Sequence, residues 1–120
     1  MACDDARGAK AIGDVFRAEH YLMDTHTAIA WAAYEECRDR GEEWTKDKTV
    51  VLSTASPYKF TRAVLAALGK EECPTDEECM QKLKKATQVE APAPLQGIFE
   101  RPICHTDVID VPDMKSYVVK

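Results

Sequence analysis

The apolar positions in the first part of the chain recur at helical spacing. They predict one helix over about residues 8–20 and a second over about residues 25–40. Asp24 stands where the second helix begins, and an aspartate there can accept hydrogen bonds from the first free backbone N–H groups. Gly41 suits the left-handed residue that often follows a helix. Two helices with a short connection are therefore expected at the N-terminal end.

A different pattern follows in the middle of the chain. Residues 49–53 form a β-branched and aliphatic run, apolar on both faces, which is typical of a strand covered by helices. Ser56 then predicts a helix N-cap, with Pro57 at the first helical position. The expected fold class is therefore α/β, helix-rich, with one buried strand over about 49–53 flanked by helices. Since one strand cannot make a sheet, its neighbour must come from outside the chain or from the C-terminal segment.

The remaining third of the chain predicts short elements. Thr75 and Glu78 form a capping box for a helix. The residues that this helix is expected to bury are Cys79, Met80, Leu83 and Ala86. Three prolines between residues 89 and 102 predict an irregular connection with one short turn. Residues 106–111 are expected to be extended and 112–119 to form a final short helix.

Composition narrows the function classes. With 120 residues and a net charge of −5, the chain fits one small domain, taken as a single segment over 1–120. No basic cluster is interleaved with aromatic residues, so no nucleic-acid partner is expected. No apolar run is long enough for a membrane span, and the N-terminus lacks a signal-peptide pattern, so a cytoplasmic protein is expected. The five cysteines contain no C-x2-C pair, which favours reduced, structural thiols over a metal site.

Two clusters carry candidate chemistry. In the first, the Thr54 hydroxyl ends the expected strand, where it could contact a ligand or bond locally. Lys59, in the first turn of the next helix, could meet a carboxylate or phosphate or remain solvated. In the second, helix N-capping is a sufficient structural role for Asp24, while His26 could contact a ligand or pack as a neutral histidine.

Specific motifs in these clusters resemble one enzyme family. Ser-Thr-Ala-Ser-Pro-Tyr-Lys-Phe at 53–60, Asp-Thr-His-Thr-Ala at 24–28 and the later His105-Thr106 stand in the order and spacing of the C-terminal part of threonine synthase. The resemblance covers nearly the whole chain. Many members have proline where Thr25 stands and histidine where Ser56 stands.

The resemblance implies a C-terminal portion of a fold-type II enzyme that uses pyridoxal 5'-phosphate. The family converts O-phospho-L-homoserine and water to L-threonine and phosphate. Thr54 matches the hydroxyl partner of the cofactor's pyridine nitrogen, while Asp24, His26, Ser53 and Lys59 match positions near the active-site cleft. No lysine of this chain stands in the family's Schiff-base motif, and the family's glycine-rich phosphate loop is also absent from the sequence. The chain alone is therefore expected to be inactive, without catalytic residues or a metal site of its own.

Two interpretations follow from these motifs. In one, the chain works with the missing N-terminal portion or another subunit that supplies the lysine, and the substrate is a small molecule. In the other, it is a free-standing, non-catalytic interaction module derived from the enzyme, with an unpaired edge or apolar face that invites a partner.

Overall fold

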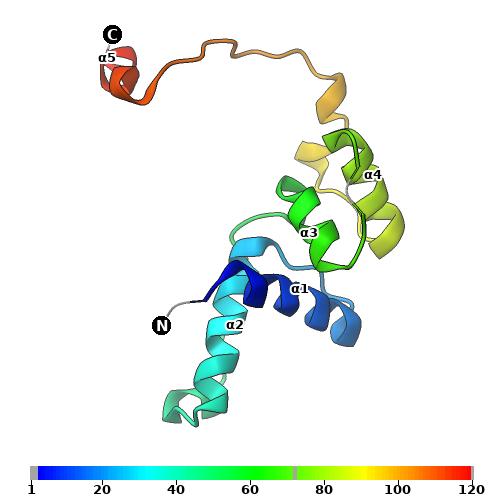
Figure 1. The fold of residues 1–120 in the computed structure, drawn as a ribbon, viewed down its shortest axis with the longest axis vertical. Coiled ribbons are helices and arrows are strands. Elements are labelled where there is room, and N and C mark those ends of the chain that lie inside the picture. The colour runs from blue at the N-terminus through cyan, green and yellow to red at the C-terminus, as the bar shows by residue number, and fades with distance from the viewer. Residues whose placement is uncertain (1–2, 72, 120) are drawn as a thin grey trace.

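Helices account for the regular secondary structure of the chain in the computed structural model, which describes residues 3–71 and 73–119. The longer elements, in chain order, are α1 (Asp5–Glu19), α2 (Thr25–Asp39), α3 (Thr61–Ala67), α4 (Asp76–Thr87) and α5 (Met114–Val118). Single 3₁₀ turns lie between them, namely η1 (Glu43–Lys46), η2 (Pro57–Lys59), η3 (Ala93–Leu95), η4 (Ile98–Glu100) and η5 (Val111–Asp113). Helices α1 to α4 form the body of the molecule (Figure 1).

The predicted strand over 49–53 is wrong, and with it the α/β fold class. No strand occurs in the described residues, and the segment between η1 and η2 is an open connection. Val50 and Leu52, expected to be buried, are each 75% exposed. A β-branched run favours extended backbone, but a strand also needs a neighbour that takes up its N–H and C=O groups. Within the described part of the chain, no segment supplies that neighbour.

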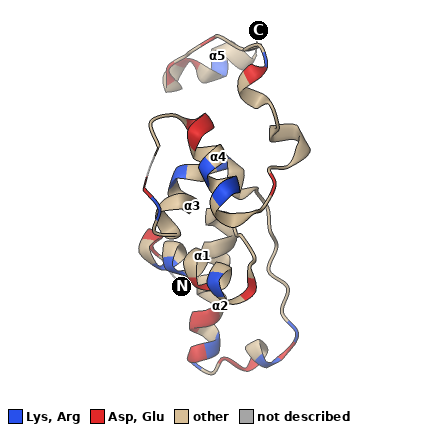
Figure 2. Ribbon diagram, turned by 90° about the vertical axis from the view of Figure 1, so that its right-hand side faces the viewer, with Lys and Arg blue, Asp and Glu red and all other residues tan. Residues whose placement is uncertain are grey.

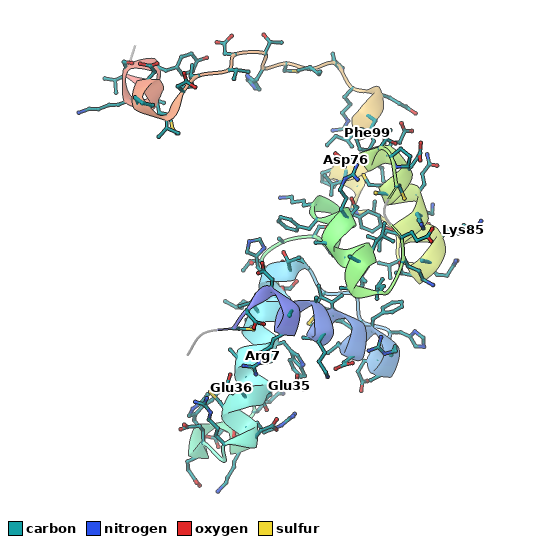
Figure 3. The ribbon with its side chains drawn as sticks, viewed as in Figure 1. Arg7, Glu35, Glu36, Asp76, Lys85 and Phe99 are labelled. Atoms are coloured by element: carbon teal, nitrogen blue, oxygen red, sulfur yellow. The ribbon has the colours of Figure 1, made fainter. Side chains whose placement is uncertain are left out.

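Close packing of α1 against α2 and α3 builds the first half of the body, and it depends on two glycines. A Cβ added at Gly8 would lie 2.8 Å from the Cδ1 atom of Ile29, at the end of a side chain. A Cβ added at Gly13 would lie 2.9 Å from the carbonyl oxygen of Ala67, which is backbone. Arg7 of α1 also forms an ion pair with Glu36 of α2 (Figure 3). Small residues on α1 therefore let three helices share one core.

The second half of the body joins α3 to α4. Arg62 donates from Nε to Asp76 at 2.8 Å and from Nη1 to the carbonyl of Cys73 at 2.8 Å. The Thr75 hydroxyl accepts from the N–H of Glu78, which confirms Thr75 as the N-cap of α4. Of the residues expected to be buried by α4, two are wrong: Met80 is half-buried and Ala86 is exposed. The largest fully buried apolar side chains of the core are Ile12, Val64, Leu65, Cys79 and Leu83.

The C-terminal arm, residues 101–119, leaves this body and ends in α5 (Figure 1). All of its residues are exposed. The radius of gyration is 17.8 Å, whereas a compact domain of this length would have about 14 Å. The final short helix expected there is confirmed, whereas residues 102–110 have no regular secondary structure and Val111 already belongs to η5. The arm's own contacts include a hydrogen bond from the Tyr117 hydroxyl to Asp107.

Charge and length of the helices bear on possible partners. Acidic and basic segments are interspersed along the helices rather than gathered on separate faces (Figure 2). Within the described ranges, no helix has the length and apolar character that crossing a membrane requires.

Candidate functional site

The start of α2 places Asp24 at the centre of a hydrogen-bond network. Its Oδ1 atom accepts from the backbone N–H of His26 at 2.9 Å and of Thr27 at 3.3 Å. Its Oδ2 atom accepts from the Thr27 hydroxyl. These hydrogen bonds confirm Asp24 as the N-cap of α2. Its side chain is completely buried and accepts more hydrogen bonds than the N-cap of any other body helix.

These bonds keep Asp24 ionised. Burial by itself would raise the pKa of the Asp24 carboxyl, but the bonds from Thr27 and from the two backbone N–H groups outweigh it and lower the pKa below its usual range. The chain therefore contains a buried carboxylate whose charge is balanced by donors on the first turn of α2.

Acid should remove the stabilisation that this charge provides. Because the pKa of Asp24 is lowered in the folded state, the contribution is fully present above the unfolded value, about 3.9, and is lost as the pH falls through the folded pKa. We expect the difference in unfolding free energy between wild type and Asp24→Asn to be constant from neutral pH to about pH 5 and to shrink below that. Urea unfolding across this pH range measures it. A difference that grows on acidification would contradict the assignment.

His26 stands beside this carboxylate with its ring open to solvent. Its Nδ1 atom lies 3.3 Å from Oδ1 of Asp24, and its side chain is 63% exposed. The ring also lies against Phe60, with centroids 5.0 Å apart. Both rings line a groove of about 570 Å³ between α1, α2 and the start of α3, which we term the His26 groove. Its other walls include Gly8, Ile12 and Ile29.

Thr54 and Lys59 occupy a second concavity. Ser53, Thr54 and Ser56 form one side of a hollow of about 390 Å³, and Lys59 also lines it. Pro92, Pro94 and Leu95 form the opposite side. We term this the Thr54 hollow. Ser53, Thr54 and Lys59 are exposed, and the Thr54 hydroxyl has no hydrogen-bond partner among the described residues.

Local capping fixes the turn at the base of this hollow. Ser56 accepts from the N–H of Tyr58 at 3.2 Å, and Pro57 follows it at the first helical position, as expected from the sequence. Tyr58 is 5% exposed and donates from its hydroxyl to the carbonyl of Val89 at 2.5 Å. Burial, and then the charge of Glu90, raise the pKa of the Tyr58 phenol, so the hydroxyl remains a donor. Tyr58 thus connects the Pro57–Lys59 turn to the segment that begins at Val89 and contains Pro92 and Pro94.

Removing this hydroxyl should loosen the hollow. We expect Tyr58→Phe to lower the free energy of unfolding by about 1 kcal/mol, because the Val89 carbonyl loses its donor. Hydrogen exchange over residues 89–96 should become faster. Tyr34→Phe is a suitable control, since Tyr34 contacts Trp31 and Trp44 through its ring. Equal effects of the two substitutions on exchange over 89–96 would contradict this role of Tyr58.

The five predicted site residues therefore fall into two groups. His26, next to Asp24, contacts Phe60 and lines the His26 groove, while Ser53, Thr54 and Lys59 line the Thr54 hollow. His105 is not part of either concavity, because it lies in the exposed C-terminal arm. The sequence reasoning missed the contributions of Phe60 and Gly8 to the His26 groove. Gly8 within a helix was a signal of close packing that could have indicated the groove.

Comparison with known proteins decides which family contains this arrangement. The family model described as "Threonine synthase, C-terminal" matches residues 27–118. The chain belongs to this family. The match includes the Thr54 hollow and extends through most of the exposed arm, so the arm belongs to the family's own pattern.

Individual threonine synthases are similar over parts of the chain. The chain is 38% identical to threonine synthase of Pseudomonas aeruginosa over 64 residues, which are 53% of this chain and 13% of the relative. It is 37% identical to threonine synthase of Schizosaccharomyces pombe over 62 residues, 49% of this chain and 11% of the relative. It is 27% identical to threonine synthase-like 1 of Mus musculus over 128 aligned positions, 98% of this chain and 16% of the relative. The chain thus spans only 11% to 16% of the length of these relatives.

The Thr54 hollow fits one end of the family's cofactor. A hydroxyl without a protein partner is suited to the pyridine nitrogen of pyridoxal 5'-phosphate, since it can donate to an unprotonated ring. The hollow is open and its three-residue turn offers no helix long enough to hold a phosphate. The residues present therefore suit a single contact to the cofactor and do not enclose it.

Proposed function

We propose that this chain is the cofactor-facing C-terminal portion of a threonine synthase, a lyase that converts O-phospho-L-homoserine and water to L-threonine and phosphate. When bound, pyridoxal 5'-phosphate supplies the electron sink for this chemistry. The observation that carries the proposal is the family match over 27–118 together with the free hydroxyl of Thr54 in an open hollow. Thr54 would bond the pyridine nitrogen without protonating it. Ser53 and Lys59 would line the same cleft.

Catalysis also needs residues that this chain does not supply. The sequence has no lysine in the family's Schiff-base motif, and the Thr54 hollow leaves the rest of the cofactor uncovered. We infer that a catalytic portion, in the same polypeptide or in another subunit, carries the lysine and completes the site. The 120-residue chain alone is then inactive.

The C-terminal arm supports such a partner. Its apolar side chains are open to solvent, with Ile103 82%, Val108 95% and Val111 80% exposed. Several large apolar side chains exposed along one segment favour an interaction surface. Since the family match extends to residue 118, this surface belongs to the family's pattern, and we expect the catalytic portion of the enzyme to cover it.

Reconstitution tests the proposal. We expect phosphate release from O-phospho-L-homoserine only when the chain is combined with the polypeptide that carries the Schiff-base lysine. Thr54→Val, which keeps the shape and removes the hydroxyl, should lower this rate and shift the cofactor's absorbance, whereas Thr54→Ser should retain both. Phosphate release by the chain alone, or equal behaviour of the Val and Ser variants, would contradict the proposal.

A free-standing interaction module is the second candidate, and the same exposed arm favours it. That function predicts a monodisperse assembly of the chain, with itself or with another protein, in the absence of any lysine-bearing partner. Size-exclusion chromatography with light scattering distinguishes the two. A defined dimer favours the module, while ill-defined association that resolves on addition of the catalytic portion favours the enzyme.

A further inference from the structure

The Asp24 and His26 side chains form a pair that capping alone does not explain. The backbone N–H groups and the Thr27 hydroxyl already satisfy the first turn of α2. The cap therefore does not require an imidazole at position 26. Yet the His26 ring is turned so that Nδ1 lies 3.3 Å from the carboxylate.

The chemistry of the two groups favours one tautomer of His26. An ionised carboxylate only accepts hydrogen bonds, so its approach to Nδ1 favours the tautomer with the proton on that nitrogen. The Thr25 hydroxyl lies 3.5 Å from the same nitrogen, and the direction of this hydrogen bond depends on the tautomer. Nε2 is then the nitrogen left for a ligand, and it has no protein partner in the described part of the chain. A buried carboxylate that orients an exposed imidazole in this way is a recurring arrangement at functional sites.

The surroundings of the ring suit a small molecule with a polar end. Phe60 packs on His26 with ring centroids 5.0 Å apart and limits the rotation of the imidazole. The His26 groove, of about 570 Å³, is lined mainly by apolar residues and contains only a few polar groups, among them Asp5 and Thr25. Binding sites for small molecules have this size and composition.

We infer that His26 contacts the substrate directly: its Nε2 atom hydrogen-bonds an oxygen of the phosphorylated substrate, and Asp24 is the positioning residue that fixes the ring through Nδ1. This inference rests on the proposed function, because the substrate is the one assigned there. It adds a polar contact in the His26 groove, which is lined by different residues from the Thr54 hollow.

Two substitutions at one position separate this role from a structural one. Asparagine places its amide nitrogen where Nδ1 lies, so His26→Asn keeps the bond to Asp24 and removes the ligand contact. Glutamine reaches the position of Nε2, so His26→Gln keeps the ligand contact. In the assembled enzyme we expect the KM for O-phospho-L-homoserine to rise about tenfold or more in His26→Asn and to stay within about threefold in His26→Gln. A His26→Asn enzyme with wild-type KM, or equal losses in both variants, would overturn the inference.

A measurement on the full chain tests the positioning step separately from turnover. ¹⁵N NMR of the imidazoles should show His26 mainly as the Nδ1–H tautomer in its neutral form, and Asp24→Asn should weaken that preference. His20 and His105, which lie away from any carboxylate pair of this kind, are internal controls for the ordinary tautomer. An Nε2–H tautomer at His26 in the wild type would overturn the positioning role. If the assembled wild-type enzyme released no phosphate, the proposed function and the substrate contact would fall together, while the tautomer would still decide the role of Asp24.

Discussion

Replacing Asp24 by alanine is expected to lower the free energy of unfolding by about 2–4 kcal/mol, the largest effect of any single substitution considered for the site. Loss of the N-cap contributes about 1 kcal/mol. The Thr27 hydroxyl, which donates to Oδ2, is left buried without its acceptor, and an unsatisfied buried group adds about 1–3 kcal/mol. Since domains of this size are stable by only about 5–15 kcal/mol, the effect should be plain in urea unfolding monitored by circular dichroism.

Asp4 offers a matched control for this substitution. It is the N-cap of α1 and accepts from the N–H of Arg7 at 2.9 Å, but it is exposed and makes no comparable buried network. Asp4→Ala should cost only about 0.5–1 kcal/mol, the ordinary value of a cap. If the two alanine variants were equally stable, the buried network around Asp24 would not contribute as we describe.

Replacing Gly13 by alanine is expected to destabilise the chain by about 1–2 kcal/mol, even though alanine is the better helix former. The new Cβ would lie 2.9 Å from the carbonyl oxygen of Ala67, so α1 and α3 would have to move apart. That movement would disturb the packing next to the turn that carries Tyr58 and Phe60. Thermal unfolding followed by circular dichroism measures the change.

The same substitution at Gly8, also on α1, is not expected to lower stability. A Cβ there would meet Cδ1 of Ile29 at 2.8 Å and Cγ1 at 3.5 Å, both atoms of a side chain that can change rotamer. Gly8→Ala should therefore leave stability unchanged or raise it by up to about 1 kcal/mol through helix propensity. A Gly13→Ala variant as stable as Gly8→Ala would contradict this account, because it would mean that α1 and α3 can move apart without loss of stability.

Local signals in the sequence predicted α2 and the cap of α4 best, whereas α1 begins earlier than expected and the helix expected after Ser56 is divided into η2 and α3. The boundaries of α2, its cap at Asp24 and the serine–proline start of the turn at Ser56 follow from side chains that bond to their own neighbours. Such interactions depend on a few adjacent residues, so the sequence contains the whole signal. The final short helix in the arm was also predicted, although no side-chain hydrogen bond caps it.

Tertiary context explains what the sequence could not predict. The run at 49–53 has the composition of a buried strand, but burial and pairing require another segment, and the described chain offers none. The His26 groove was missed because it forms only when Gly8, Ile29 and Phe60 come together from three elements. Neither the exposure of Thr54 nor its empty hydrogen-bonding capacity could be predicted from its neighbours.

The mass and composition of the native product test the central claim most directly, namely that this segment works as the cofactor-facing portion of threonine synthase. An antibody against residues 53–60 would isolate the product from source cells for native mass spectrometry. We predict either a species much heavier than 13.4 kDa that contains both this segment and the Schiff-base lysine peptide, or a 13.4 kDa chain in stoichiometric complex with the polypeptide that carries it. A 13.4 kDa chain that purifies without any lysine-bearing partner would contradict the account.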